Sequence, residues 1–336
     1  MKNLKILFAF VLLSFTFSCT VDDEDVDNAP LTILNRIEAS SNYTYLNYAL
    51  QKTGLSNVLN GTEKYTLFAP SNMVMARFLM QNGFSSLDDV PEEFLKIILL
   101  NHVIAGELPY RNFETGYAKT AALSDATGLP MSIHIEQVNM RVTLNGEAMI
   151  TRGNIMASNG IIHTVNRVIP LPTVVTFVTA DANFKNLAQA VTREDLSVDF
   201  VEVLSTNAYN SPAPFTVFAP NNTAFVNLLS ELGLSSLGDI DEPTLKATLT
   251  YHVIAETNAL SSQLSDNLQL TTLGGNITAN VTGGATITDG NNRVSNIIAV
   301  DVQANNGVIH VIDKVILPNL FYFQLKFLSI LLLIIG

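Results

Sequence analysis

The sequence predicts two copies of an α+β domain, because three short motifs occur twice in the same order and each copy passes from helical to alternating spacing. The repeated pairs are Phe68-Ala69-Pro70 and Phe218-Ala219-Pro220, His102-Val103-Ile104-Ala105 and His252-Val253-Ile254-Ala255, and Asn159-Gly160-Ile161-Ile162-His163 and Asn306-Gly307-Val308-Ile309-His310. Their members lie 150, 150 and 147 residues apart. This period is too long for a solenoid unit and fits a duplicated whole domain.

The composition agrees with two core-forming domains. Of the 336 residues, 48% are hydrophobic and 14% charged, which is typical of globular chains and not of disordered ones. Lysine and arginine total 18 against 30 acidic residues, and this net charge of −12 argues against nucleic acid as a partner. The single cysteine excludes an intrachain disulfide and a multi-thiolate metal site.

The first motif of each copy predicts the end of a strand. Residues 65–68 and 215–218 are aromatic and β-branched, which favours strands, and Pro70 and Pro220 stop them because proline lacks a backbone N–H.

Two helices are predicted in the first half of each copy. The expected ranges are 73–80 and 91–100 in the first copy, and 223–229 and 242–250 in the second. We expect the pairs Ser71-Asn72 and Asn221-Asn222 to cap the earlier helix of each copy by accepting backbone N–H bonds, with Asn72 and Asn222 as the simplest caps. Proline and acidic residues suit the first turn of the later helix, which leads directly to His102 or His252.

The second half of each copy predicts a β-meander. Residues 131–135 and 141–144 alternate between apolar and polar, and Asn145-Gly146 favours a tight turn. Glycine pairs within 273–277 and 281–285 indicate similar turns in the second copy. Each copy closes with an Asn-Gly turn and a β-branched strand.

Three segments of the second copy together resemble the fasciclin domain. They are Thr216 to Phe225, the pair Tyr251-His252, and Asn306 to Pro318. The resemblance implies two tandem fasciclin-like domains, over 33–172 and 174–318, each with a helical N-terminal part packed on a β-meander or β-sandwich-like part. The first copy diverges more: Val74-Met75 replaces Ala-Phe, Asn101 replaces the tyrosine, and Asn166 replaces the aspartate found at Asp313.

The resemblance implies an extracellular adhesion or matrix-binding module and no enzymatic activity, cofactor or metal. Some animal members of the family use the Tyr-His region for adhesion, so Tyr251 and His252 are the corresponding candidates, with Asn101 and His102 as a weaker counterpart. The alternative for this pair is structural, because a half-buried histidine is usually hydrogen-bonded within its own fold.

Structural roles are also expected for other polar residues of the motifs. His163 and His310 lie within β-branched strands, which predicts a place in the core. Asp313 is expected to pair with a buried donor, since an unpaired buried charge is costly. The sequence has no H-E-x-x-H, G-x-S-x-G or P-loop motif.

The first 32 residues predict export and attachment. Residues 1–18 resemble a signal peptide, and Cys19 at its end resembles the lipid-attachment cysteine of bacterial lipoproteins. The alternative is a plain signal peptide with a chance cysteine. Residues 19–32 include five acids and no base, which indicates a solvated tether. This acidic segment resembles the stretch that sends some bacterial lipoproteins to the outer surface of the outer membrane. The alternative is that it is only a soluble linker.

The last 18 residues, 319–336, are apolar but interrupted by Gln324 and Lys326. About ten apolar residues remain after Lys326, roughly half of what a spanning helix needs. A membrane-contacting tail, a packing strand and a sequence-end artefact all remain open. Only Leu171-Pro172-Thr173 joins the two copies, which predicts a fairly fixed orientation.

Two functions follow from these observations. The first is a non-enzymatic adhesion lipoprotein, held in the cell envelope by lipid on Cys19 and binding a matrix protein or polysaccharide. The second is a structural or accessory component of the cell envelope without an external ligand. A hydrolase ranks below both, because it would need an acidic cluster in a cleft that spacing alone does not reveal.

Overall fold

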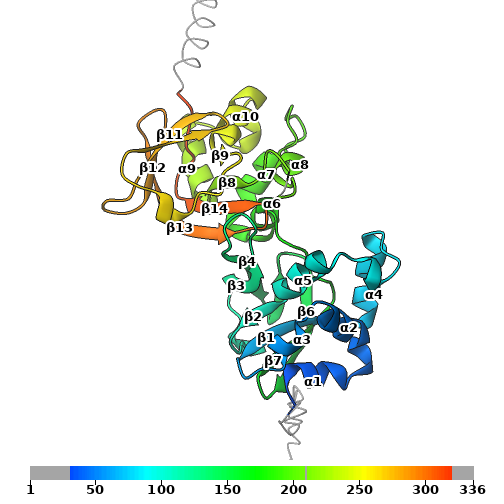
Figure 1. Ribbon diagram of the computed structural model, residues 1–336. Helices are drawn as coiled ribbons and strands as arrows, with labels where there is room; N and C mark the ends of the chain where they lie inside the picture. The colour runs from blue at the N-terminus through cyan, green and yellow to red at the C-terminus, as the bar shows by residue number, and fades with distance from the viewer. Residues whose placement is uncertain (1–30, 209, 320–336) are drawn as a thin grey trace, which may run out of the picture.

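The computed structural model describes residues 31–208 and 210–319, and these form two domains lying end to end (Figure 1). The predicted signal peptide, Cys19, most of the acidic tether and the apolar tail lie outside the described residues. Within the described part, no helix is long and apolar enough to cross a membrane.

Each domain opens with helices and continues into a sheet. The helices of the first domain are α1 (Ile33–Glu38), α2 (Thr44–Lys52), α3 (Ser56–Leu59), α4 (Asn72–Gln81) and α5 (Glu92–Asn101). Its strands are β1 (Tyr65–Pro70), β2 (Val103–Ala105), β3 (Gly116–Leu123), β4 (Pro130–Val138), β5 (Arg141–Leu144), β6 (Ala148–Ala157) and β7 (Gly160–Val165).

The second domain repeats this order. Its helices are α6 (Val174–Ala180), α7 (Lys185–Val191), α8 (Phe200–Leu204), α9 (Asn222–Leu232) and α10 (Glu242–Tyr251). Its strands are β8 (Phe215–Pro220), β9 (Val253–Ile254), β10 (Leu268–Thr272), β11 (Gly275–Asn280), β12 (Thr286–Thr288), β13 (Val294–Gln303) and β14 (Gly307–Ile312). Short 3-10 turns are η1 (Ser41–Tyr43), η2 (Leu87–Asp89), η3 (Tyr110–Asn112), η4 (Ala182–Phe184), η5 (Leu237–Asp239) and η6 (Ser261–Gln263).

The α+β class and the meander are confirmed. In the first domain β1 to β7 pair in sequence order, and β7 pairs in parallel with β1, which closes a seven-stranded barrel. In the second domain the order is β10-β11-β12-β13-β14-β8-β9, with β14 parallel to β8. The parallel pair brings the first and third motifs of each copy side by side.

Each sheet buries apolar side chains on both faces. In the first domain Leu67 and Ile162 face the helices, whereas Phe68 and Ile133 fill the barrel. In the second domain Val217 belongs to the core under the helices and Phe218 to the core inside the sheet. The Phe-Ala-Pro strand therefore contributes side chains to both hydrophobic cores of its domain, because successive side chains of a strand point to opposite faces.

The third motif attaches the first helix of each domain to its sheet. Asn159 accepts the backbone N–H of Ile33 at 2.7 Å and donates to the carbonyls of Leu59 and Gly61. Asn306 makes the same set of bonds with Val174, Leu204 and Thr206. These buried asparagines satisfy backbone groups that would otherwise lie unpaired.

The prediction that Asn72 and Asn222 cap helices is wrong. They are the first residues of α4 and α9, and their side chains bond instead to the first turns of α2 and α7. Asn72 accepts the N–H of Tyr45 and donates to the Ser41 carbonyl, and Asn222 bonds to Asn186 and Ala182 in the same way. The prediction holds for Asn221, which caps α9 by accepting the N–H of Ala224 at 2.9 Å, whereas Ser71 precedes α4 without a side-chain capping bond.

Candidate functional site

The predicted histidines, His102 and His252, lie in the core of each domain and tie a helix to the segment that follows the last strand of that domain. His252 follows α10, where its Nδ1 bonds to the Thr248 carbonyl at 2.7 Å and its Nε2 accepts the N–H of Ile316 at 3.1 Å. His102 makes the same two bonds, to the Ile98 carbonyl at 2.8 Å and from the Ile169 N–H at 2.9 Å. Each ring therefore connects a helix C-terminus to the segment that follows β7 or β14.

These bonds require the neutral ring. Because Nε2 accepts a backbone N–H, the ring proton is on Nδ1, and a second proton would place N–H against N–H. Burial lowers the pKa of both His102 and His252 to about 4, opposed in part by the carbonyl each ring faces. At neutral pH both rings are uncharged and have no nitrogen left to bind a partner.

Tyr251 lies beneath the β10–β11 hairpin. Its hydroxyl donates to the Asn276 carbonyl at 2.6 Å, and its side chain belongs to the core inside the sheet. An added Cβ at Gly274 would lie 2.7 Å from the Tyr251 backbone nitrogen, so this position requires glycine. Burial raises the pKa of Tyr251. The tyrosine thus holds the hairpin against the end of α10.

In the first domain Asn101 replaces this tyrosine and bonds to the residues just before the linker. Its Nδ2 donates to the Pro170 carbonyl at 3.0 Å, and its Oδ1 faces Thr120. In the second domain Asn291 makes the corresponding bond, to the Pro318 carbonyl at 2.9 Å. The two domains therefore fasten their closing segments with asparagines from different positions in the fold.

The structure places the whole predicted adhesion pair inside the fold. Tyr251 is 2% exposed and His252 3%, and Asn101 and His102 are also buried. The alternative interpretation, a structural role, agrees with all their hydrogen bonds. A role in adhesion stays a prediction for these residues. Because they are buried, they would affect binding by stabilising the domain that carries the binding surface.

The other motif residues occupy structural positions as expected. His163 and His310 are buried in β7 and β14, where their Nε2 atoms bond to the carbonyls of Leu108 and Ala259 at 2.9 Å. Asp313 accepts from the backbone N–H of Asn296 at 2.8 Å and from the Ser295 hydroxyl at 3.2 Å.

The junction between the domains contains a buried polar group. Tyr117 on β3 donates to Asp181 Oδ2 at 2.9 Å, and its ring packs edge-on against Phe177 of α6. His134 on β4 lies beside Tyr117, with its Nε2 4.0 Å from Asp181 Oδ1. Burial lowers the pKa of His134, although Asp181 acts in the opposite direction. A carboxylate of the second domain therefore meets two aromatic rings of the first.

A second set of bonds crosses the junction at the end of β13. Gln303 donates its backbone N–H to the Ser132 hydroxyl at 3.0 Å, and its side chain donates to the Ser124 hydroxyl at 3.3 Å. Lys119 donates to the Asp301 carbonyl at 2.8 Å. Bonds at both Asp181 and Gln303 agree with the expected fixed orientation of the domains.

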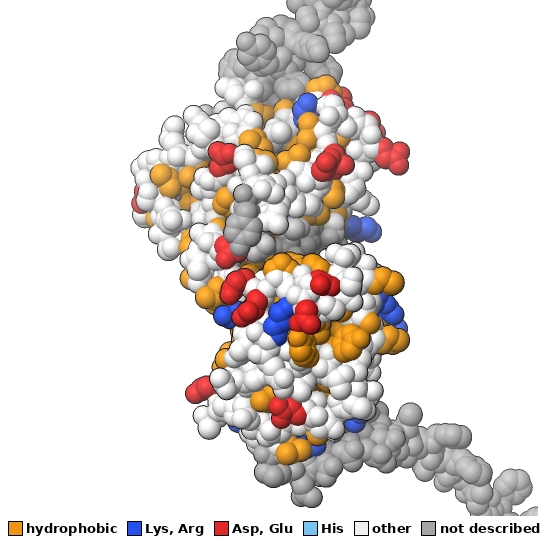
Figure 2. All heavy atoms as spheres, turned by 45° about the vertical axis from the view of Figure 1, so that its right-hand side comes forward, with side chains coloured by type: hydrophobic (Ala, Val, Ile, Leu, Met, Phe, Trp, Pro, Cys, Tyr) orange, Lys and Arg blue, Asp and Glu red, His pale blue; other side chains and the backbone are white. Residues whose placement is uncertain are grey.

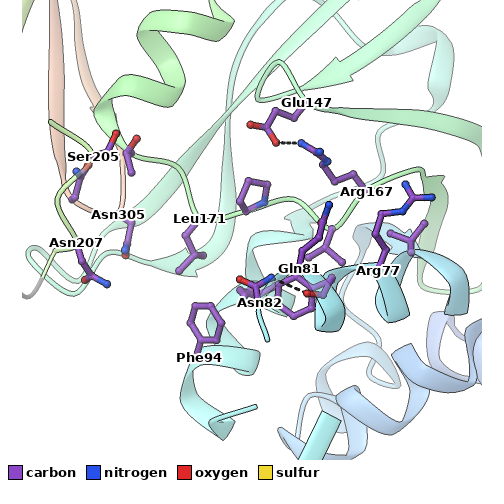
Figure 3. A pocket seen from close by; sticks show the side chains of 17 residues that line it. Arg77, Gln81, Asn82, Phe94, Glu147, Arg167, Leu171, Ser205, Asn207 and Asn305 are labelled. Atoms are coloured by element: carbon purple, nitrogen blue, oxygen red, sulfur yellow. Dashed lines mark hydrogen bonds and ion pairs between the residues drawn. The ribbon is translucent and has the colours of Figure 1, made fainter. Parts of the chain in front are cut away.

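A cleft of about 400 Å³ opens beside the linker, between the two domains. Figure 3 shows Arg77 and Gln81 rising from α4 toward the side where Arg167 and Glu147 lie, with Asn207 and Asn305 of the second domain across the cleft. Figure 2 shows hydrophobic side chains and charges of both signs gathered on the first domain near this junction.

Sequence reasoning missed the junction residues, including Tyr117, Asp181 and Gln303. One signal was present: His134 is the one histidine of five without a counterpart in the other copy. A buried residue unique to one copy has a role that the repeat does not share, here contact with the other domain. Within 31–208 and 210–319, no group of three or more His, Cys, Asp or Glu side chains is placed to hold a metal.

The profile of the Fasciclin domain matches the chain twice, over residues 41–172 and 182–318. The chain belongs to the fasciclin domain family. Its two fasciclin domains resemble a solved pair of such domains from the insect cell adhesion molecule Fasciclin I, with a TM-score of 0.50 and 19% identity. That match covers 80% of this chain and 95% of the solved one, and it shows the fold alone.

Several fasciclin-domain relatives are similar in sequence. Human periostin is 27% identical over 79% of this chain, and pig transforming growth factor-beta-induced protein ig-h3 is 26% identical over 78%. The chain spans only 30% and 36% of those two proteins. An uncharacterized Synechocystis protein is 37% identical over 44% of the chain and is matched over 98% of its own length.

Proposed function

We propose that this chain is a non-enzymatic adhesion protein of the cell surface, whose tandem fasciclin domains bind a matrix protein or a polysaccharide. The observation that carries the proposal is the pair of fasciclin domains, an arrangement also found in Fasciclin I, which is named as a cell adhesion molecule. The similarity to periostin and ig-h3 supports it.

The junction suits an adhesive role. Bonds at Asp181 and Gln303 hold the domains in one orientation, so both present their surfaces to a partner together. Such preorganisation reduces the entropy lost on binding and allows two weak contacts to act on one polymer.

We further propose that lipid on Cys19 holds the chain at the outer membrane with the second domain outermost. The described chain begins at α1, which lies at the end of the first domain farthest from the second (Figure 1). A tether before α1 would therefore leave the second domain facing away from the membrane.

In this proposal Tyr251 and His252 support adhesion by holding the β10–β11 hairpin and the chain end in place. Tyr251→Phe keeps the ring and removes only the bond to the Asn276 carbonyl, whereas Tyr251→Ala empties part of the core. We expect the phenylalanine variant to bind like the native chain. The alanine variant is expected to lose 3–5 kcal/mol of stability, about the usual cost of deleting a large buried ring, and to lose binding with it.

The test measures binding of the two variants and the native chain to immobilised matrix proteins and polysaccharides, with thermal unfolding measured in parallel. Loss of binding by a fully stable Tyr251→Phe variant would assign the hydroxyl a direct contact instead. If the native chain binds nothing and co-purifies with envelope proteins, the alternative of a structural envelope component replaces adhesion.

Attachment is tested separately by Cys19→Ser. We expect the variant to leave the membrane fraction, because serine cannot form the thioether to lipid. Detergent-free fractionation of cells, followed by immunoblotting, measures the distribution. A variant that still sediments wholly with membranes would contradict lipid anchoring and point to the segment 319–336.

A further inference from the structure

We propose that the cleft between the domains binds a carboxylate-bearing sugar within a polysaccharide, with the carboxylate at Arg77. This inference rests on the proposed adhesive function and names the ligand class and the place where it binds. It arises from the cleft, in which cationic, amide and aromatic side chains of two domains converge.

The size and position of the cleft suit a small polar ligand. Its volume of about 400 Å³ is within the range of pockets that hold small molecules, and junctions between domains are frequent locations for them. A neighbouring cavity of about 210 Å³ shares four lining residues with it, so the two form one elongated site. The shared residues are Phe94, Leu171, Asn207 and Asn305.

Charge selects an anion at one end of this site. The lining of the larger cavity includes Arg77, Arg167 and Glu147. Arg167 pairs with Glu147, whereas Arg77 has no ion-pair partner among the residues that the structure describes. The lining of the larger cavity therefore carries one positive charge that no acidic side chain of the described structure pairs with, although the net charge of the chain is −12. A guanidinium binds a carboxylate through two parallel hydrogen bonds, which makes this group the best fit.

The rest of the lining suits sugar hydroxyls. Gln81 and Asn305 carry amides, and each amide both donates and accepts hydrogen bonds, as neighbouring hydroxyls do. The Asn305 Oδ1 atom is buried and has no hydrogen-bond partner in the described structure. Turning this amide toward a ligand would relieve an unsatisfied buried acceptor. Phe94, 37% exposed, offers an apolar surface to the face of a sugar ring.

The acidic side chains at the opposite end of the site favour a neutral sugar next to the acidic one. Glu93 and Asp125 line the smaller cavity. Carboxylates accept hydrogen bonds from hydroxyls but repel a second carboxylate. The site is therefore expected to prefer a uronic acid linked to a neutral sugar over two adjacent uronic acids.

The test compares two disaccharides that differ in one group. Cellobiouronate carries a carboxylate where cellobiose carries a hydroxymethyl group, and ligand-observed NMR measures the dissociation constant of each for the full chain in detergent. We expect cellobiouronate to bind and cellobiose to bind at least tenfold more weakly. Equal affinities, or no binding of cellobiouronate, would overturn the inference.

Three variants locate the site. Arg77→Gln should weaken cellobiouronate binding about tenfold to hundredfold, the usual effect of losing a charged hydrogen bond. Asn305→Asp, on the facing wall, should also weaken it by placing a negative charge near the ligand. Arg111→Gln removes an exposed arginine of η3 that does not line the cleft, and should leave the affinity unchanged. Thermal unfolding checks that all three fold.

Other outcomes separate this inference from the proposed function. If Arg77→Gln and Arg111→Gln bind cellobiouronate alike, the cleft is not its site. If the native chain binds an immobilised matrix protein but not cellobiouronate, adhesion stands and the cleft inference fails. Equal binding of the blocked dipeptide acetyl-Glu-Ser-amide would overturn the assignment to a saccharide.

Discussion

The buried histidines are the clearest link between single residues and the stability of this protein. His102 and His252 each accept a backbone N–H and donate to a helix carbonyl, so their neutral form is built into the fold. His163 has a pKa lowered to about 4 by burial as well. In an unfolded chain all three would titrate near 6.5.

This difference predicts that acid destabilises the protein at a pH well above the titration of carboxylates. Because the unfolded state binds more protons, the stabilisation is complete above pH 6.5 and falls as the pH drops toward 4. Each of the three histidines should cost about 2 kcal/mol between pH 7 and pH 5. Urea unfolding at several pH values measures the loss.

Imidazole NMR signals provide the control for this prediction. They should show no titration of His102, His163 or His252 above pH 5 in the folded protein. Stability that stays level from pH 7 to pH 5, or rings that titrate near 6.5, would contradict the account.

At the scale of elements, the Asn-Gly motif explains how the barrel of the first domain closes. The asparagine bonds to three backbone groups, and the glycine sits where β7 begins to pair in parallel with β1. Gly160 has a φ of 149°, and a Cβ there would overlap the Tyr65 carbonyl oxygen. Glycine is thus needed both for the backbone angle and for the close approach of the strands.

We expect Gly160→Ala to destabilise the first domain by about 3 kcal/mol, since overpacking adds to backbone strain. Gly54→Ala is the matched control, because Gly54 has a φ of 69° but open space around it. Its cost should be about 1 kcal/mol, from strain alone. Chemical denaturation of both variants measures the difference, and equal losses would show that the strand contact contributes nothing.

At the scale of the whole molecule, the two domains act as one body through buried polar contacts. Tyr117 and Asp181 form the central bond, and burial raises the pKa of Tyr117 so that its hydroxyl stays a donor. Asp181 also caps η4, directly after α6, by accepting the N–H of Asn183 at 2.9 Å. A substitution of Asp181 would therefore remove contacts in both domains.

Tyr117→Phe is expected to loosen the junction without unfolding either domain. The lost bond to a buried carboxylate is worth about 2 kcal/mol. Hydrogen–deuterium exchange should rise in both β4 and α6. Tyr110→Phe removes a bond to the Met140 carbonyl inside the first domain and should raise exchange only near that bond. A Tyr117→Phe variant that exchanges like the native chain would show that the bonds of Gln303 and Lys119 hold the junction without the Tyr117–Asp181 bond.

Although it missed the helices before the first strand of each domain, α1–α3 and α6–α8, the sequence by itself determined the duplication, the α+β class, the helices α4, α5, α9 and α10, the β-meander and the family. These are encoded locally, in turn residues, in hydrophobic spacing and in motifs short enough to read along the chain. It also predicted core positions for His163 and His310, because β-branched neighbours on both sides indicate a buried strand.

Only the tertiary structure decided the junction and the cleft. Tyr117 and Asp181 are 64 residues apart, and Ser132 and Gln303 are 171 apart, with no shared motif to connect them. Comparison of the two copies does not reveal these residues either, since residues that join two copies must differ between the copies. The same holds for the burial of Tyr251 and for the bonds of Asn72 and Asn222 to distant helices. These features depend on which distant segment packs against each residue, and no local sequence pattern predicts that segment.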